Sequence, residues 1–254
     1  MRILFCVVAA LFTGSFLRAQ EVPTPGYENG TNLNVLYRND MSGKIFGTTR
    51  GFGIAFRQGK HVTSKTRSFY DIELQNLKHP KEVKISGDAD SRRRYVYGKV
   101  NSVLLLRGAL GLQNIIFHKG DHKAVEVRYA YSVGPVFAFA KPYYVQIYKT
   151  NYTYGHSQTA TVKFDSDNFT QDSGQVAGRG QFLEGISETV IYPGLNANFN
   201  LSFEYAPYTN LIRALEVGIS LDYFPKALPI MARNPAENII LTFHLGFVFG
   251  RKWF

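Results

Sequence analysis

The stretch AVEVRYAYSVGP, residues 124–135, alternates between two kinds of side chain. One parity is apolar or aromatic and consists of Val125, Val127, Tyr129, Tyr131 and Val133. The other parity is charged or small and consists of Glu126, Arg128, Ala130, Ser132 and Gly134. Because successive side chains of a β-strand point to opposite faces, this pattern predicts a strand with one apolar face. That face would form the core of a soluble sheet or the lipid-facing side of a membrane barrel.

The same alternation recurs along the chain and predicts eight strands. They include residues 33–37, 52–56, 70–74, 104–112, 125–147, 197–205, 215–221 and 239–249. Most are close to the roughly 9–11 residues that cross a bilayer at a tilt. The stretch from 125 to 147 is interpreted as one long strand that bends near Pro135 or Pro142.

The connections between these strands are expected to alternate in length. They are predicted at 40–44, 58–65, 77–98, 118–122, 150–188, 206–210 and 224–237. With both termini in the periplasm, the odd-numbered connections face outside, and all of them are long except the first, Asp40 to Lys44. Short turns on one side and long loops on the other are typical of outer-membrane barrels.

The distribution of lysine distinguishes the two possible directions of the apolar face. Lysines, including Lys44 and Lys141, fall in the expected connections or at strand ends. A soluble sheet would carry lysine along its exposed strands, especially at edges. A lipid-facing strand cannot, because a lysine or arginine at the bilayer midplane costs about 2–4 kcal/mol. The pattern therefore favours a barrel whose apolar face meets lipid.

The opposite face of the strands is rich in Gly, Ala, Ser and Asn and holds isolated ionisable groups. These groups are Asp71, Glu73, Arg107, Glu126, Arg128, Glu204, Glu216, Asp222 and His244. Eight strands enclose a lumen just wide enough to be filled by side chains. We therefore expect a lumen ion-pair network rather than a catalytic site.

The first residues, MRILFCVVAALFTGSFLRAQ, have the pattern of a secretory signal peptide. Arg2 gives a positive start, an apolar stretch follows, and Ala19 is a small residue before the expected cut. We predict a signal peptide at 1–19 and a barrel domain at 20–254. No later segment approaches the ~20 continuous apolar residues that a membrane helix needs.

The export signal, the eight alternating strands and the aromatic last strand, FHLGFVF at 243–249, resemble the small Gram-negative outer-membrane barrels of the OmpA/OmpX type. The resemblance is architectural and covers nearly the whole chain after the signal. It implies an all-β fold, an eight-stranded antiparallel up-and-down transmembrane β-barrel in the cell outer membrane. It also implies contact with lipopolysaccharide, and recognition of the last strand by the barrel-assembly machinery. The matching positions here are Gly246, Phe249 and Phe254.

One predicted loop carries three successive arginines, Arg92, Arg93 and Arg94. Because arginine binds phosphate with two hydrogen bonds, these residues could hold lipopolysaccharide phosphates or an acidic partner. The alternative is an ordinary solvated run of charge.

No catalytic residue, metal site or cofactor is predicted. His156 and Ser157 are neighbours in the longest loop and point apart in an extended segment, so they form no nucleophile–base pair. His244, with Glu204 or Glu216 in reach, is interpreted as a buried and satisfied histidine. The run DSDNFTQDSG, residues 165–174, lacks the glycine and glutamate spacing of a calcium loop.

The favoured function is a structural or interaction protein, an accessory component of an envelope secretion or assembly complex, and not a pore. One alternative is a lipid-modifying enzyme, which needs His156 or His244 within about 3.2 Å of a serine or an acid. Another is a soluble lipocalin-like binding barrel, in which Val127, Tyr129 and Phe203 line a cavity. Nucleic acid is not expected as a partner of an exported chain whose basic residues are dispersed.

Overall fold

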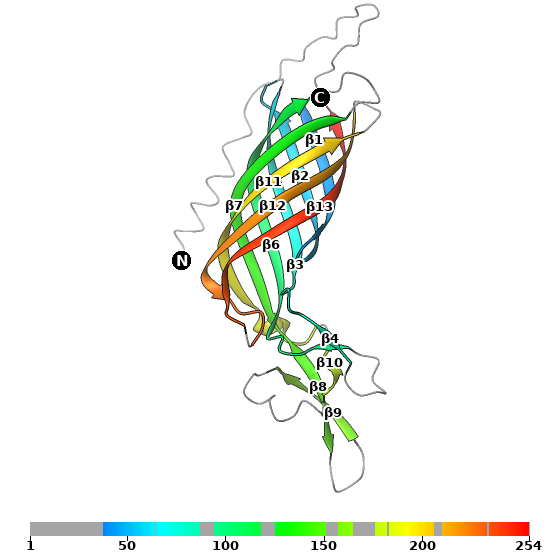
Figure 1. The fold of residues 1–254 in the computed structure, drawn as a ribbon, viewed down its shortest axis with the longest axis vertical. Helices are drawn as coiled ribbons and strands as arrows, with labels where there is room; N and C mark the ends of the chain where they lie inside the picture. Colours follow the sequence, from blue (N-terminus) through cyan, green and yellow to red (C-terminus); the bar gives the residue numbers. More distant parts are fainter. Residues whose placement is uncertain are drawn as a thin grey trace, which may run out of the picture. The chain divides into compact units, whose positions relative to one another are not determined.

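The chain folds into a closed antiparallel β-barrel, seen in a computed structural model (Figure 1). The structure describes residues 38–63, 65–86, 94–117, 125–150, 157–164, 176–181, 183–205, 210–232 and 234–253. The barrel strands are β1 (Asn39–Thr48), β2 (Gly51–His61), β3 (Thr66–Leu77), β6 (Asn101–Phe117), β7 (Glu126–Pro142), β11 (Val190–Glu204), β12 (Leu211–Leu228) and β13 (Glu237–Trp253). Their order around the barrel is β1-β13-β12-β11-β7-β6-β3-β2. The prediction of an eight-stranded antiparallel barrel is confirmed.

The barrel closes between its first and last strands. β1 pairs with β13 from Asn39↔Trp253 to Thr48↔His244, and on its other side it pairs with β2. Each barrel strand therefore has two hydrogen-bonded neighbours. Closure leaves no open sheet edge, which is the condition for strands to cross a hydrocarbon layer.

The apolar parity of the strands points outward. In β7, Tyr131 and Val133 are 46% and 63% exposed, whereas Arg128 and Ser132 are buried. Val127 and Tyr129 share the outward parity of Tyr131. The soluble lipocalin-like alternative is therefore wrong, because it required these apolar side chains inside the barrel, where charged groups pair instead.

Every barrel strand contributes a large exposed apolar side chain to this surface. Examples, one from each strand, are Ile45, Ile54, Ile72, Leu110, Val133, Leu195, Ile219 and Phe247. Soluble proteins rarely expose a contiguous apolar surface of this extent. In a bilayer the same surface is matched to the lipid chains, so the barrel is a membrane-spanning one.

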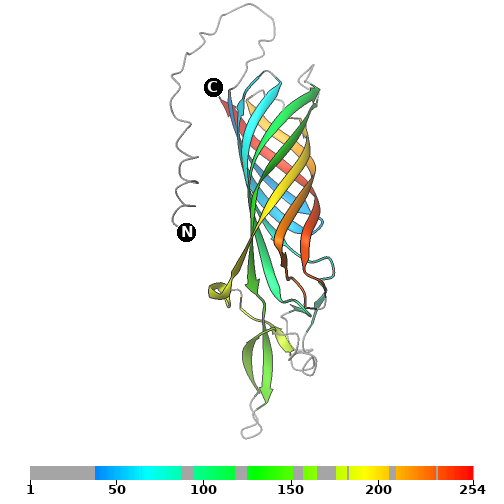
Figure 2. The ribbon, with the colours of Figure 1, turned by 90° about the vertical axis from the view of Figure 1, so that its left-hand side faces the viewer.

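The connections fall at two ends of the barrel. At the turn end, β2 is followed by β3, β6 by β7 and β11 by β12, and β1 begins and β13 ends there. At the loop end, lower in Figures 1 and 2, β1 is followed by β2, β3 by β6, β7 by β11 and β12 by β13, and the shorter strands that are not part of the barrel lie at this end. The strand bounds confirm two of the three predicted long connections, between β3 and β6 and between β7 and β11. The connection between β12 and β13 is shorter than predicted, because β12 continues to Leu228.

The first strand lies further along the chain than predicted. Residues 33–37 are outside the described part of the chain, and the predicted first turn, Asp40 to Lys44, lies within β1. The turn between β1 and β2 is Thr49–Arg50. The outward-facing positions of β1 are occupied alternately by apolar residues and by glycine. The apolar periodicity of this strand is therefore weak, and its sequence resembles that of a turn. Lys44 is thus a mid-strand residue.

The predicted long strand at 125–147 is interrupted once. β7 runs through Pro135 to Pro142, and β8 (Tyr144–Thr150) begins after Tyr143. The Tyr143 amide leaves the barrel ladder and donates to the carbonyl of Val100 at 2.8 Å. The break therefore lies at the second of the two prolines considered.

The segments at the loop end contain strands of their own. They are β4 (Lys84–Ile85), β5 (Tyr95–Val96), β9 (Ser157–Lys163) and β10 (Val176–Arg179), with a 3-10 turn, η1 (Ile186–Glu188). β4 pairs with β5, and a small sheet has the order β10-β8-β9. Among the described residues, no helix has the length and apolar character needed to cross a membrane.

Candidate functional site

Charged side chains fill the lumen because they occupy every second position of several strands. All nine predicted lumen residues lie on the inward parity. Those that form ion pairs are Asp71, Glu73, Arg107, Glu126, Arg128, Glu204, Glu216 and Asp222. The ninth, His244, is buried beside Ser220.

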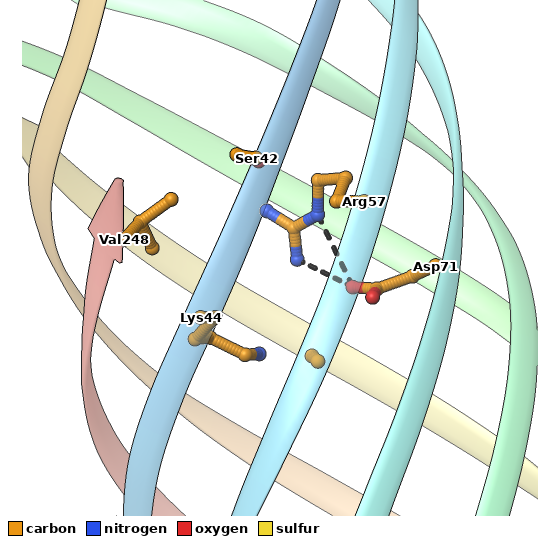
Figure 3. Close-up of a pocket in the computed structure, with 6 residues that line it drawn as sticks. Ser42, Lys44, Arg57, Asp71 and Val248 are labelled. Atoms are coloured by element: carbon orange, nitrogen blue, oxygen red, sulfur yellow. Dashed lines mark hydrogen bonds and ion pairs between the residues drawn. The ribbon is translucent and has the colours of Figure 1, made fainter. Parts of the chain in front are cut away.

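At the centre of the lumen, two cations share one carboxylate. Lys44 Nζ lies 2.8 Å from Glu73 Oε1 and 3.0 Å from Glu216 Oε1. Arg57 reaches Glu216 Oε2 with Nη1 at 2.8 Å and Asp71 Oδ2 with Nη2 at 2.7 Å. Figure 3 shows the Arg57 guanidinium turned toward the Asp71 carboxylate, with Lys44 on the neighbouring strand. Each charge here has at least one partner of opposite sign.

Arg107 extends the same network toward the loop end. Its Nε and Nη2 donate to the two carboxylate oxygens of Asp222 at 2.9 and 2.6 Å. Its Nη1 donates to Gln75 Oε1 at 2.6 Å and to Glu73 Oε2 at 3.3 Å. The planar guanidinium therefore donates hydrogen bonds to three side chains, and such charge-assisted, bidentate hydrogen bonds are strong.

The central network joins strands that are not neighbours in the barrel. Glu216 and Asp222 lie on β12, while Arg57 lies on β2 and Arg107 on β6. β1 and β13 separate β2 from β12 on one side, and β7 and β11 separate β6 from β12 on the other. These ion pairs therefore cross the lumen and connect opposite walls.

A second group of ion pairs lies toward the turn end. Glu204 receives Arg128 Nη2 and Lys252 Nζ, each at 2.7 Å, and Arg128 also pairs with Glu126. Nearby, Arg67 Nη1 lies 2.8 Å from Asp40 Oδ2. The lumen is thus ionic from its centre to its turn end.

The charges of the lumen nearly cancel. The paired cations are Lys44, Arg57, Arg67, Arg107, Arg128 and Lys252, and the paired carboxylates are Asp40, Asp71, Glu73, Glu126, Glu204, Glu216 and Asp222. An uncompensated buried charge is penalised by several kcal/mol, so each depends on its partners. Because the attraction within a buried pair is largely offset by the desolvation of its charges, the main effect of these pairs is to specify which walls meet.

Packing is tight around the central ion pairs of the lumen. The gap among Lys44, Arg57 and Asp71 has no room for a water molecule (Figure 3). Toward the loop end, inward-facing apolar side chains form an apolar plug. The plug comprises Leu77, Val103, Leu105, Val136, Ala138, Ala140, Tyr192, Phe224, Leu228, Ile230 and Ile240. Charge pairs and apolar packing thus occupy successive levels of the barrel.

Of the two histidine candidates, the structure describes His244, and its surroundings are not those that the enzyme alternative required. His244 Nδ1 lies 3.4 Å from Ser220 Oγ, longer than the reach that the enzyme alternative required. Both residues are buried in the lumen, and Glu204 and Glu216 are bound by cations instead. His156 lies outside the described residues. Within the described ranges, no group of three His, Cys, Asp or Glu side chains is arranged to hold a metal ion.

The other predicted site residues fall partly outside the described chain. Arg92 and Arg93 are outside it, and Arg94 is exposed next to β5. Gly246 and Phe249 lie in β13, where Phe249 faces outward. Phe254 is outside the described residues.

Sequence reasoning missed five charged residues of the lumen ion pairs: Asp40, Lys44, Arg57, Arg67 and Lys252. Arg57 continues the small-residue parity of Gly53 and Ala55, which was a usable signal. Asp40 and Lys44 were hidden by the misplaced first turn.

The connections at the loop end pack around a core of their own. We name residues 78–86, 94–100, 143–150, 157–164, 176–181 and 229–232 the loop-end assembly. Its buried cluster comprises Tyr95, Tyr143, Val145, Phe164 and Val176. The Tyr143 hydroxyl accepts the amide of Val96 at 3.2 Å, and burial raises the pKa of that phenol. The Val100 amide donates to the Ile230 carbonyl at 3.0 Å, which connects two different loops.

Comparisons with known proteins find similarity in architecture. No protein-family model matches the chain, and no curated protein matches it significantly. Neisserial surface protein A (NspA) is 10% identical, with a TM-score of 0.41, over 85% of this chain and 97% of that one. Ail, the attachment invasion locus protein of Yersinia pestis, is 7% identical at a TM-score of 0.33, covering 85% and 97%. OprG from Pseudomonas aeruginosa is 8% identical at 0.30, covering 85% and 94%.

These likenesses are distant, and the class of the protein follows from its own strand pairing and burial. A closed barrel of eight antiparallel strands, apolar outside and polar inside, is the architecture of the small outer-membrane barrels of the OmpA/OmpX type. The chain is an OmpA/OmpX-like barrel in this architectural sense.

Proposed function

We propose that this protein is a non-enzymatic outer-membrane barrel that acts through its loop end as a structural or interaction protein. One observation carries the proposal: the loop-end assembly has its own buried aromatic core around Tyr95 and Tyr143. A barrel whose role was confined to the membrane would not need an ordered core in its loops. Loops on a rigid scaffold are where binding residues concentrate.

The barrel does not form a pore. The ion pairs of Lys44, Arg57 and Arg107 cross the lumen. Between these ion pairs and the loop end, the apolar plug fills the lumen. Eight-stranded barrels enclose only enough space for side chains, which supports this part of the proposal.

Both termini of the barrel face the periplasm, and the loop end faces outside. The support is the length of the connections, since short turns are periplasmic and long loops extracellular in bacterial barrels. A signal peptide at 1–19 directs export, and Gly246, Phe249 and Phe254 carry the recognition of the last strand by the barrel-assembly machinery.

The partner of the loop-end assembly is a component of an envelope secretion or assembly complex, to which this protein is an accessory. The assembly exposes apolar side chains such as Val83 and Val162. Exposed apolar residues on an ordered surface favour a protein contact. The run Arg92–Arg94 supplies a contact for lipopolysaccharide phosphates or an acidic surface.

The test is to replace residues 144–181 by a short Gly/Ser connection in the full chain and express it in its native host. The control replaces residues 118–125, at the turn end, in the same way. Crosslinking and purification of the tagged barrel identify its neighbours, and slower gel migration after boiling shows that the barrel is folded. We expect the crosslinked neighbours to be lost only with 144–181. An unchanged set of neighbours in that folded variant contradicts the proposal.

A further inference from the structure

A cavity opens at the loop end beside the turn that joins β1 and β2. It has a volume of about 330 Å3, and its lining includes Thr48, Thr49, Arg50, Phe52, Lys78 and Glu82. The amide of Lys78 donates to the carbonyl of Arg50 at 2.7 Å, so the turn and the segment after β3 are joined. The cavity is therefore formed by two connected segments, on the wall where the barrel strands are shortest.

Most ionised groups at this cavity already have a partner. Both oxygens of Glu82 accept Lys99 Nζ at 2.8 Å. Arg50 pairs with Glu237 at the start of β13. Lys78 differs, because within the described part of the chain it forms no ion pair, and its Nζ lies 5.8 Å from the centre of the Phe52 ring. The cavity thus has one uncompensated positive charge.

Two hydroxyl groups add hydrogen-bond donors. Thr48 Oγ1 accepts bonds from the Arg50 amide and from Gln75 Nε2, both at 3.2 Å. Thr49 Oγ1 accepts from the Phe243 amide at 3.4 Å. A hydroxyl can donate one bond while it accepts others, and neither threonine hydroxyl donates to another described residue, so both can donate to an acceptor in the cavity. Free charge and free donors both favour an anionic, oxygen-rich ligand.

The cavity also borders the lipid-facing surface. Phe52 is 62% exposed, and the next outward residue of β2, Ile54, is 56% exposed. A ligand in the cavity would therefore have an aqueous polar pocket on one side and the apolar barrel wall on the other. Only an amphiphile matches both.

We propose that this cavity binds the phosphate of a membrane lipid headgroup. Lys78 pairs with the phosphate, the hydroxyls of Thr48 and Thr49 donate to its oxygens, and the acyl chains lie along Phe52 and Ile54. The site rests on the membrane placement in the proposed function but is independent of any protein partner. A free inorganic phosphate would satisfy Lys78 and leave the adjoining apolar wall unused, which is why the lipid is favoured.

The experiment measures lipid retained by the folded full chain, by native mass spectrometry from detergent. The probes are lipid A, lipid A with its phosphates removed, and inorganic phosphate, because the loop end faces the lipopolysaccharide leaflet in the proposed function. Lys78→Gln removes the charge, and Lys84→Gln, an exposed lysine of β4 outside the cavity lining, is the matched control. A third variant, Lys78→Arg, keeps the positive charge. The heat-dependent gel shift confirms folding of each variant.

We expect lipid A to be retained by the unaltered chain, and about fivefold less by Lys78→Gln, since a charge-assisted contact is lost. Lys84→Gln and Lys78→Arg should retain it as the unaltered chain does. Equal retention of the dephosphorylated lipid A would show that the phosphate plays no part and would overturn the proposal. So would phosphate binding without the lipid, or retention unaffected by Lys78→Gln. None of these outcomes alters the protein-partner test, which involves residues 144–181.

Discussion

Arg57 on β2 and Glu216 on β12 form an ion pair across the barrel, with 2.8 Å between Nη1 and Oε2. The two residues are 159 positions apart in the sequence, and β1 and β13 lie between their strands. Glu216 also holds Lys44, and Arg57 also holds Asp71. One carboxylate thus connects three strands and depends on all of them being in register.

Removing the charge of Glu216 should be strongly destabilising. Glu216→Gln nearly keeps the volume but leaves Lys44 and Arg57 each short of a partner in a buried site. Breaking a buried pair from one side typically costs about 3–5 kcal/mol. The measurement is the free energy of unfolding in urea, with the barrel in lipid vesicles.

The control for this variant is Glu188→Gln, because the ion pair between Glu188 and Lys163 at the loop end is exposed to solvent. Exposed ion pairs contribute little. If both substitutions change the unfolding free energy equally, the central network does not hold the barrel walls together.

Gly134 and Gly108 provide a second matched pair, on the adjacent strands β7 and β6. A Cβ on Gly134 would lie 1.9 Å from the backbone oxygen of Gly108, whereas a Cβ on Gly108 meets nothing within 4 Å. Gly134→Ala should therefore destabilise the barrel by about 1–3 kcal/mol through overpacking. Gly108→Ala should stay within about 0.5 kcal/mol. Urea unfolding of the two variants decides, and equal stabilities would mean that β7 can shift to admit the methyl group.

The barrel was predictable because the alternation of apolar and polar side chains is visible within each strand separately. The parity of Tyr131 and Val133 against Arg128 and Ser132 fixes which face is apolar, and the same period repeats in other strands. The positions of Glu73 and Asp222 on the polar parity likewise suffice to place them in the lumen. Periodicity shows which side a residue faces, and in a closed barrel that is most of the fold.

The partners of these residues were not predictable, because they depend on which walls meet. Nothing in the sequence near Arg107 indicates Asp222, since the contact crosses the lumen between strands that are not paired. β1 was misplaced because glycines interrupt its outward parity. The core around Tyr143 and Phe164 joins short strands separated by long connections, and such contacts have no periodic signal.

A lysine on the outer surface tests whether that surface meets lipid. Val133 is 63% exposed in β7, and Val83 is 67% exposed in the loop-end assembly. Val133→Lys should cost about 2–4 kcal/mol if the residue lies near the bilayer midplane. Val83→Lys, away from the barrel wall, should fold as the unaltered chain does. The yield of heat-shifting barrel in lipid vesicles measures both, and equal yields would argue against a bilayer around β7.

The packed lumen predicts an electrically silent protein. Purified barrel added to a planar bilayer should produce no stable conductance steps, because the Arg107–Asp222 pair and the apolar plug lie across the lumen and eight strands enclose only enough space for side chains. Successful insertion is checked by protease protection in vesicles prepared in parallel. Reproducible ohmic steps from inserted protein would show that the lumen opens, and the function would then have to be sought in transport.

Acidification should loosen the segment after β3 through His79. Burial lowers the pKa of its imidazole below the ordinary value of 6.5. The positive charges of Arg50 and Lys81 lower this pKa further, whereas the carboxylates of Glu237 and Glu82 raise it. The neutral ring also accepts the Lys81 amide at Nδ1, at 3.2 Å, and a protonated ring cannot. The unfolded segment therefore binds a proton more readily than the folded one. Local stability is full above the unfolded pKa and falls as the pH drops below it toward the folded value.

Hydrogen exchange of residues 78–86 measures this effect between about pH 7.5 and 5.5, with rates corrected for the intrinsic pH dependence. Protection should decrease on acidification in the unaltered chain and stay constant in His79→Asn, whose amide oxygen can replace Nδ1 as the acceptor for the Lys81 amide. Amides in the middle of β13 serve as an internal control, since their barrel pairing does not involve His79. Constant protection in the unaltered chain would mean that Glu237, 3.6 Å from Nε2, compensates the charge when the ring is protonated.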